Sequence, residues 1–332
     1  MKQKILVSVV GTFIFASFYL AEAQTPKAMP RIGFIFSTGA PGIPSLHSAL
    51  FNAFRQGLRD LGYVEGKNVL IERRYAEGRL DRMPAFVREF VQQEVDVIMG
   101  VNNVVIRAAR DATKTIPIVM LSSIDPVAAG YVESFAHPGG NITGLAWLSR
   151  DLSAKRVELL KELLPKMSRV GVLWDADGPG PAIAFKEYNA AAQAFKLDLR
   201  SLEVRGPTPD LPGAFRVAKT ARLDALIVVA NPLMGQRAKQ VFELATKNRL
   251  PSMTEEGRYV EVGGLMSYGA NLADLYRRAA GYVVDILKGA KPGDLPLTPP
   301  TKFEIFINLK TAHQLGLVIP KHVLVRANRV IK

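Results

Sequence analysis

Short apolar segments alternate with longer amphipathic segments along most of the chain. Ile32–Phe36 carries no polar side chain, as expected of a strand buried in a parallel sheet. Apolar residues then recur at helical spacing between positions 46 and 61, which predicts a helix that Gly62 ends. Asp125-Pro126 is typical of the start of a helix. The same patterns predict strands at 68–74, 95–100 and 117–121 and helices at 83–93 and 104–113. Such alternation predicts a parallel sheet with helices on both faces.

The pattern occurs twice, with order and spacing largely kept. Each copy of the first strand begins with an arginine, and each copy of a later strand has an aspartate at its second position. The repeated segments are Arg31–Ile35 with Arg169–Leu173, Val95–Gly100 with Leu223–Val228, and Ala112–Lys114 with Ala245–Lys247. The expected fold class is therefore α/β, with two similar doubly wound parallel-sheet lobes and a binding cleft between them.

Glycine- and proline-rich segments indicate where the chain passes from one lobe to the other. We expect crossings near Gly140, near Gly264 and near Pro300. A long helix at 152–164 opens the second lobe, a helix at 273–288 follows the second crossing, and a strand at 303–307 follows the third. The expected first lobe is 30–142 plus about 269–299, and the second is 143–268 plus about 300–332.

The N-terminus has the pattern of a secretory signal peptide. Lys2 and Lys4 precede an uncharged apolar run, and Ala21-Glu22-Ala23 is a typical cleavage site before Gln24. The alternative is a permanent membrane anchor, for which the apolar run is short. The chain has no cysteine, so a lipid on an N-terminal cysteine is excluded. We therefore expect cleavage after Ala23, residues 1–23 as the signal peptide, and an unlipidated protein of the periplasm.

Composition and motifs exclude several function classes. The formal charge is +13, but the basic residues are scattered and aromatic residues do not interleave with them, so no nucleic-acid partner is expected. The four histidines lack metal-ligand spacing, and neither a phosphate loop nor a nucleophile elbow is present. The sequence therefore predicts no cofactor, no metal and no catalytic residues.

Ligands of open α/β sheets bind beyond the carboxyl ends of the strands, and this rule selects the candidate residues. Most are small polar residues that also occur as ordinary caps and turns, as Asp125 and Asn271 do at the starts of helices. Trp174 is the most ligand-like aromatic residue, with core packing as its alternative role. The candidates are Ser37, Thr38, Asn102, Asn103, Ser122, Ser123 and Asp125 in the first lobe, Trp174, Asp175, Asn231 and Glu255 in the second, and Tyr268 and Asn271 near the second crossing.

Several motifs together resemble one family. They are Leu58–Asn68 with Glu72, Arg74, Ala76, Glu77 and Gly78, then Asp125–Val127, Pro138–Gly144, Pro300–Glu304 and Asn308–Ala312. The chain resembles the ABC-transporter substrate-binding family that includes tryptophan- and tyrosine-uptake binding proteins, over essentially all of its mature length. The resemblance implies a type I periplasmic-binding-protein fold with a hinge, a small-molecule ligand and a permease partner in the inner membrane. Lipidated relatives have a cysteine after the signal, which is missing here.

The main hypothesis is a monomeric solute receptor that closes around a small molecule without chemistry. An exported enzyme that uses the same cleft, or a ligand-sensing subunit of a membrane receptor, are the alternatives. The resemblance favours an aromatic amino acid, although an aromatic carboxylate or another small acid could use the same anion site without the ammonium partner. Ser37, Thr38, Ser122 and Ser123 are candidates for that anion site. Asp125, Asp175 or Glu255 could bind the ammonium group, with Trp174 or Tyr268 stacking on the ring.

Overall fold

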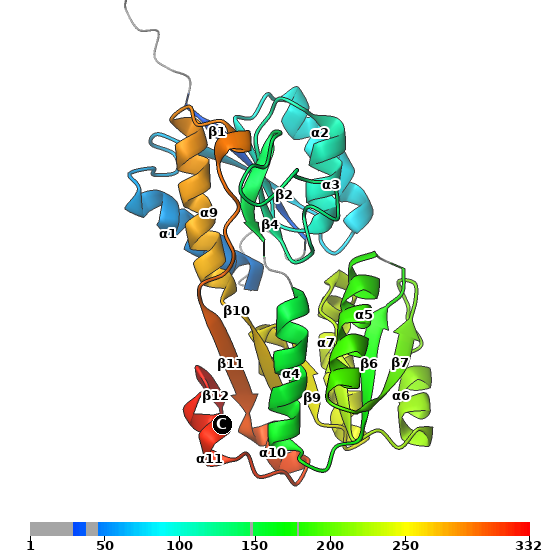
Figure 1. Cartoon of the computed structure of the whole chain (residues 1–332). Helices are drawn as coiled ribbons and strands as arrows, with labels where there is room; N and C mark the ends of the chain where they lie inside the picture. Colours follow the sequence, from blue (N-terminus) through cyan, green and yellow to red (C-terminus); the bar gives the residue numbers. More distant parts are fainter. Residues whose placement is uncertain (1–28, 38–45, 147–148, 178) are drawn as a thin grey trace, which may run out of the picture.

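The computed structural model describes residues 29–37, 46–146, 149–177 and 179–332. Figure 1 shows two lobes, each built around its own sheet and joined along one side. The first sheet has the order β2-β1-β3-β4-β5 and all its neighbouring strands are parallel. Its strands are β1 (Arg31–Phe36), β2 (Leu70–Tyr75), β3 (Val97–Gly100), β4 (Ile118–Ser122) and β5 (Ile142–Ala146).

The second sheet has the order β12-β11-β10-β9-β8-β6-β7. Only the pair β10 and β11 is antiparallel among the pairings described. The strands are β6 (Arg169–Asp175), β7 (Asp198–Val204), β8 (Ala225–Val228), β9 (Ser252–Thr254), β10 (Met266–Ala270), β11 (Phe303–Asn308) and β12 (Arg329–Ile331). The prediction of two α/β lobes with parallel sheets is confirmed.

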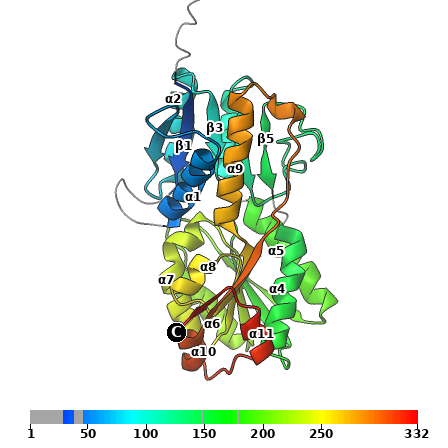
Figure 2. The same cartoon turned by 90° about the vertical axis from the view of Figure 1, so that its left-hand side faces the viewer.

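The helices cover both faces of each sheet (Figures 1 and 2). The first lobe contains α1 (Leu46–Asp60), α2 (Met83–Gln92), α3 (Asn103–Ala112) and α9 (Leu272–Leu287). The second contains α4 (Ser149–Leu163), α5 (Pro179–Ala194), α6 (Leu211–Thr220), α7 (Pro232–Lys247), α8 (Gly257–Glu261), α10 (Leu309–Gln314) and α11 (Lys321–Val325). Short 3₁₀ turns lie at Leu80–Arg82 and Pro292–Asp294.

The internal repeat seen in the sequence is a repeat of topology. The strand order β7-β6-β8-β9-β10 of the second sheet matches β2-β1-β3-β4-β5 of the first. The repeated aspartates also have the same role, because Oδ2 of Asp96 accepts from the backbone N–H of Arg31 at 2.7 Å and Oδ2 of Asp224 accepts from that of Arg169 at 2.8 Å. Each aspartate therefore ties the start of one strand to the start of its neighbour.

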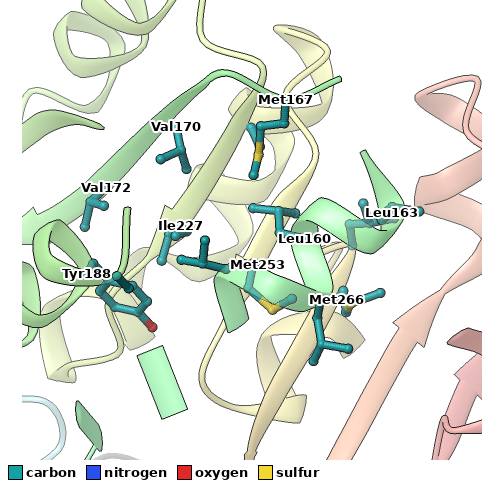
Figure 3. Packing of buried hydrophobic residues seen from close by; sticks show 14 of the residues in the cluster. Leu160, Leu163, Met167, Val170, Val172, Tyr188, Ile227, Met253 and Met266 are labelled. Atoms are coloured by element: carbon teal, nitrogen blue, oxygen red, sulfur yellow. The ribbon is translucent and has the colours of Figure 1, made fainter. Parts of the chain in front are cut away.

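The lobes exchange one helix each. Helix α4 follows β5 of the first sheet but packs beside α5 in the second lobe, and α9 follows β10 of the second sheet but packs along α1 in the first. Apolar residues of α9 complete the core on one face of the first sheet, together with Phe34, Phe54 and Leu58. On the matching face of the second sheet, Leu160 and Leu163 of α4 pack with Tyr188, Met253 and Met266 (Figure 3).

Three local predictions need correction. Strand β5 was not predicted, and its pairing with β4 places residues 143–146 in the first lobe, so the first crossing follows Ala146. The glycine-flanked segment near Gly264 leads into β10, and the second crossing follows Ala270. The helix expected at Asp125 is a turn, because Gly130 adopts a left-handed conformation (φ +66°) directly after it. Within the described residues no helix is long and apolar enough to cross a membrane.

We expect Asp224→Ala to lower the free energy of unfolding by about 1–2 kcal/mol, since it removes the acceptor of two backbone N–H groups, those of Ser168 and Arg169. Burial alone would raise the pKa of Asp224, but these hydrogen bonds outweigh it and lower the pKa. The stabilisation is therefore complete above the unfolded pKa of about 3.9 and is lost as the pH falls through the folded pKa.

Urea denaturation at pH 7 and at pH 3 measures this effect. The difference between wild type and Asp224→Ala should shrink at the lower pH. Asp198→Ala, which removes an exposed carboxylate from the neighbouring strand, is the control and should change stability little at either pH. A difference that grows on acidification would contradict the assignment.

Candidate functional site

In the first lobe, the ends of β1 and β3 are joined by a polar pair. Nδ2 of Asn102 donates to Oγ of Ser37 at 2.9 Å, and Ser37 is buried. Oδ1 of the same Asn102 accepts from the backbone N–H of Val104 and Val105 and so caps helix α3. The cap and the strand end therefore hold each other in place at the carboxyl edge of the sheet.

The second lobe has the equivalent pair at the ends of β6 and β8. Nδ2 of Asn231 donates to Oδ2 of Asp175 at 3.0 Å, while Oδ1 of Asn231 caps helix α7 by accepting from Met234. The other carboxylate oxygen of Asp175 accepts from the N–H of Asp177. Asp175 thus occupies the place that Ser37 has in the first lobe.

The two equivalent sites differ in charge. The first lobe presents a hydroxyl and an amide, whereas the second presents a carboxylate, and no arginine or lysine in the described part of the chain lies within ion-pair distance of Asp175. The helix ends differ as well, since α3 begins at Asn103 with a backbone N–H and α7 begins at Pro232 without one. The first lobe therefore suits an anionic group and the second a cationic group.

Next to this pair, β9 ends at a buried ionic network. Nη1 of Arg156 in α4 donates to the hydroxyl of Tyr188 at 3.0 Å and to Oε1 of Glu255 at 3.3 Å, and its Nε donates to the carbonyl of Tyr268 at 2.7 Å. The hydroxyl of Tyr188 in turn donates to Glu255 at 3.1 Å. Arg156 is only 1% exposed, so these partners replace its hydration.

The network keeps its charges. Burial alone would lower the pKa of Arg156, but the adjacent Tyr188 and Glu255 outweigh it and raise the pKa. Burial also raises the pKa of Tyr188, which keeps its phenol neutral and able to donate. Gly269 on β10 allows the close approach, because a Cβ there would lie 2.0 Å from the carbonyl oxygen of Glu255. Glu255 is thereby held at the strand end as a compensated carboxylate.

A second ion pair follows immediately, between Glu256 and Arg258. The guanidinium of Arg258 lies 4.8 Å from the ring centroid of Tyr259, and the hydroxyl of Tyr259 donates to the carbonyl of Asn231 at 3.3 Å.

The sequence did not predict Arg156, Tyr188 and Arg258 as residues of the site. One signal was present, because Arg156 lies four residues from both Leu152 and Leu160, on the apolar face of its helix.

The other candidates of the first lobe lie at the ends of β3 and β4. Ser122 is fully buried, and its hydroxyl donates to the carbonyl of Ile124 at 3.0 Å, with Oδ1 of Asn103 at 3.4 Å. Ser123 is exposed. Oδ1 of Asp125 accepts from the N–H of Val127 and of Ala128, so this carboxylate has the local capping geometry of its alternative role. Thr38 lies outside the described residues.

The two aromatic candidates, Trp174 and Tyr268, differ in how far they are buried. Trp174 is buried, stacks on Phe185 at 5.0 Å between centroids, and donates its indole N–H to Ser201 at 2.8 Å. This geometry fits the core role rather than ligand stacking. Tyr268 is half-buried and stacks on Phe303, with 6.0 Å between the ring centroids.

Asn271 lies at the second crossing. Its Oδ1 caps α9 and its Nδ2 donates to Glu304 at 2.8 Å, which ties the second crossing to β11. Burial raises the pKa of Glu304 even though Asn271 and Arg329 oppose it.

No group of three or more histidine, cysteine, aspartate or glutamate side chains that could hold a metal ion occurs among the residues described.

The chain is similar to known substrate-binding proteins of ABC transporters. Residues 44–331 match the model of the family described as ABC transporter substrate binding protein. The tyrosine-binding protein of Clostridioides difficile strain R20291 is 30% identical over 281 residues, which is 82% of this chain and 78% of that protein.

Two solved structures are similar over nearly their whole length. A domain from Streptococcus pneumonia in complex with L-Trp has a TM-score of 0.82 at 26% identity, covering 91% of this chain and 99% of that one. A conserved domain protein from Vibrio cholerae has a TM-score of 0.81 at 29% identity with the same coverage. With a family match over residues 44–331 and polar side chains at the strand ends of both lobes, the chain belongs to the ABC transporter substrate-binding proteins, which bind solutes for import and are not enzymes.

Proposed function

We propose that the solute is an aromatic L-amino acid, bound between the lobes. The observation that carries the proposal is the charge difference between the two equivalent strand-end pairs. Ser37–Asn102 is neutral and lies beside the N-terminus of α3, whereas Asp175–Asn231 carries a carboxylate. A zwitterion matches this arrangement, with its carboxylate toward the first lobe and its ammonium toward Asp175.

The relatives support the same class of ligand. One is named a tyrosine-binding protein, and another was solved in complex with L-Trp. In the proposed complex, Ser37, Asn103 and Ser123 contribute to the carboxylate site, and Asp175 is the main partner of the ammonium. Glu255, whose charge is balanced by Arg156, is a second carboxylate near the ammonium site in this proposal. Tyr268 is the candidate for stacking on the aromatic ring, a contact worth about 0.5–1.5 kcal/mol beyond area burial.

The proposal includes the protein's location and partners. Signal cleavage after Ala23 would release an unlipidated monomer into the periplasm, where closure around the solute creates the form that a membrane permease recognises. The crossings support closure, because α9, β10 and β11 lead from one lobe to the other along one side and each lobe has its own sheet (Figure 1).

Asp175→Asn tests the ammonium assignment. Removing the charge while keeping the size of the side chain should weaken L-tryptophan and L-tyrosine binding by about 10- to 100-fold, since a hydrogen bond to a charged group contributes about 1.5–3 kcal/mol. Indole-3-propionate lacks the ammonium, so its binding should change little. Isothermal titration calorimetry on refolded, ligand-stripped protein measures both.

The matched control is Asp177→Asn, two residues away. Its carboxylate is exposed and accepts from the N–H of Gly206 at 2.6 Å, outside the proposed ammonium site. This variant should bind all three compounds as wild type does. An equal loss for tryptophan and indole-3-propionate, or an equal effect of the two substitutions, would rule out Asp175 as the ammonium partner.

Maturation is tested separately by mass spectrometry of the exported protein. The expected N-terminus is Gln24, because Ala21 and Ala23 supply the small side chains that signal peptidase requires. Ala23→Arg should block cleavage and leave the precursor in the membrane fraction. Wild-type protein that keeps residues 1–23 in the membrane fraction would instead support the anchor interpretation.

A further inference from the structure

Among the described residues, one hydrogen bond joins the two lobes away from the crossings. Nε2 of Gln236 in α7 of the second lobe donates to the carbonyl oxygen of Gly78, which follows β2 in the first lobe, at 3.1 Å. Other hydrogen bonds between the lobes, among the described residues, lie where the chain crosses, such as Asn271 to Glu304 and Lys302 to Asp274. Because the donor and the acceptor belong to different lobes, the distance between them changes when the lobes open or close.

The backbone around Gly78 is shaped for this contact. Gly78 has φ +83°, a left-handed conformation that glycine adopts most easily, and its N–H donates to the carbonyl of Ser37 at 2.8 Å. A Cβ at Gly78 would lie 3.1 Å from Nε2 of Gln236, which leaves little room for any side chain. The turn thus presents its carbonyl oxygen to α7 and keeps the approach open.

The hydrogen bond also connects the two polar pairs of the candidate site. On one side, Gly78 is bound to Ser37, whose hydroxyl accepts from Asn102. On the other side, Gln236 lies in the first turns of α7, the helix that Asn231 caps while it donates to Asp175. The Gln236–Gly78 hydrogen bond therefore links the segments that carry the two strand-end pairs, Ser37–Asn102 in the first lobe and Asp175–Asn231 in the second.

We propose that the Gln236–Gly78 hydrogen bond is a latch that forms when the lobes close and slows release of the bound solute. A rotation about the crossings would move α7 away from the turn at Gly78 and break the bond, since the two groups belong to different lobes. The latch makes no contact with the solute in this proposal. It acts on the equilibrium between the open and closed forms, and a more stable closed form releases the solute more slowly.

The test uses variants on both sides of the latch. Gln236→Ala removes the donor, and Gln236→Glu keeps the size but places a carboxylate against a carbonyl oxygen, so its effect should be larger. The net value of one hydrogen bond corresponds to a shift of about 2- to 10-fold in the closed-to-open ratio for Gln236→Ala. Gln240→Ala, on the exposed face of the same helix, is the matched control and should behave as wild type.

Gly78→Ala tests the other side, and Gly66→Ala separates backbone strain from the latch. Gly66 has a similar left-handed conformation, φ +79°, but a Cβ there would meet no atom within 4 Å. Gly78→Ala should therefore open the protein and Gly66→Ala should not. If the latch is real, Gly78→Ala should add little in a Gln236→Ala background, as expected of two partners in one interaction.

Closure is measured by single-molecule fluorescence energy transfer. The chain has no cysteine, so labels can be attached to cysteines introduced at two exposed positions, Arg107 in α3 and Lys219 in α6. The ligand-free measurement reports the equilibrium directly, and stopped-flow release of L-tryptophan should be faster in Gln236→Ala by the same factor, with a nearly unchanged association rate.

The release measurement rests on the proposed aromatic amino acid, whereas the ligand-free measurement does not. Failure of L-tryptophan to bind wild type would thus count against the proposed solute only, and the ligand-free distributions would still decide the latch. Distributions of Gln236→Ala and Gly78→Ala that match those of Gln240→Ala and Gly66→Ala would overturn it.

Discussion

The packing of α9 against α1 is the contact on which the rest of the structure depends. The strands of the first lobe are complete by Ala146, but the core on one face of its sheet also needs Leu275, Ala279 and Val283 from a helix that follows the second sheet. The second lobe depends in the same way on α4, which follows the first sheet. Neither apolar core is finished until the chain has crossed and returned, so each lobe depends on a helix that follows the sheet of the other lobe.

With the cores apolar, the polar side chains of the candidate site lie at the carboxyl ends of the strands. The carboxyl ends of β1, β3, β6 and β8 carry two related pairs, Ser37–Asn102 and Asp175–Asn231, in which one asparagine both caps a helix and binds the neighbouring strand end. The asparagines are structural in both lobes, and their geometry is nearly the same. The two pairs therefore differ in the partner residue, which is a serine in one lobe and an aspartate in the other, and in the helix start, which has an N–H in one lobe and a proline in the other.

The buried Arg156 shows how the second lobe tolerates more negative charge at the strand ends. Glu255 and Glu256 are adjacent in the sequence, and each has its own arginine, Arg156 from α4 and Arg258 from the start of α8. Arg156 reaches Glu255 only because α4 comes from the other side of the first crossing. The exchanged helix thus contributes both to the core and to the charge balance at the end of β9.

The sequence by itself determined the class of fold, the duplication and the family resemblance, because strand–helix alternation and the repeated Arg31 and Arg169 segments are local patterns. It also selected the strand ends, since the carboxyl-edge rule follows from parallel topology. Only the tertiary structure decided that β5 belongs to the first sheet, that Trp174 is packed on Phe185, and that Arg156 meets Glu255. These outcomes depend on contacts between segments far apart in the chain, and the spacing of residues along a single helix or strand carries no information about which distant segment will pack against it.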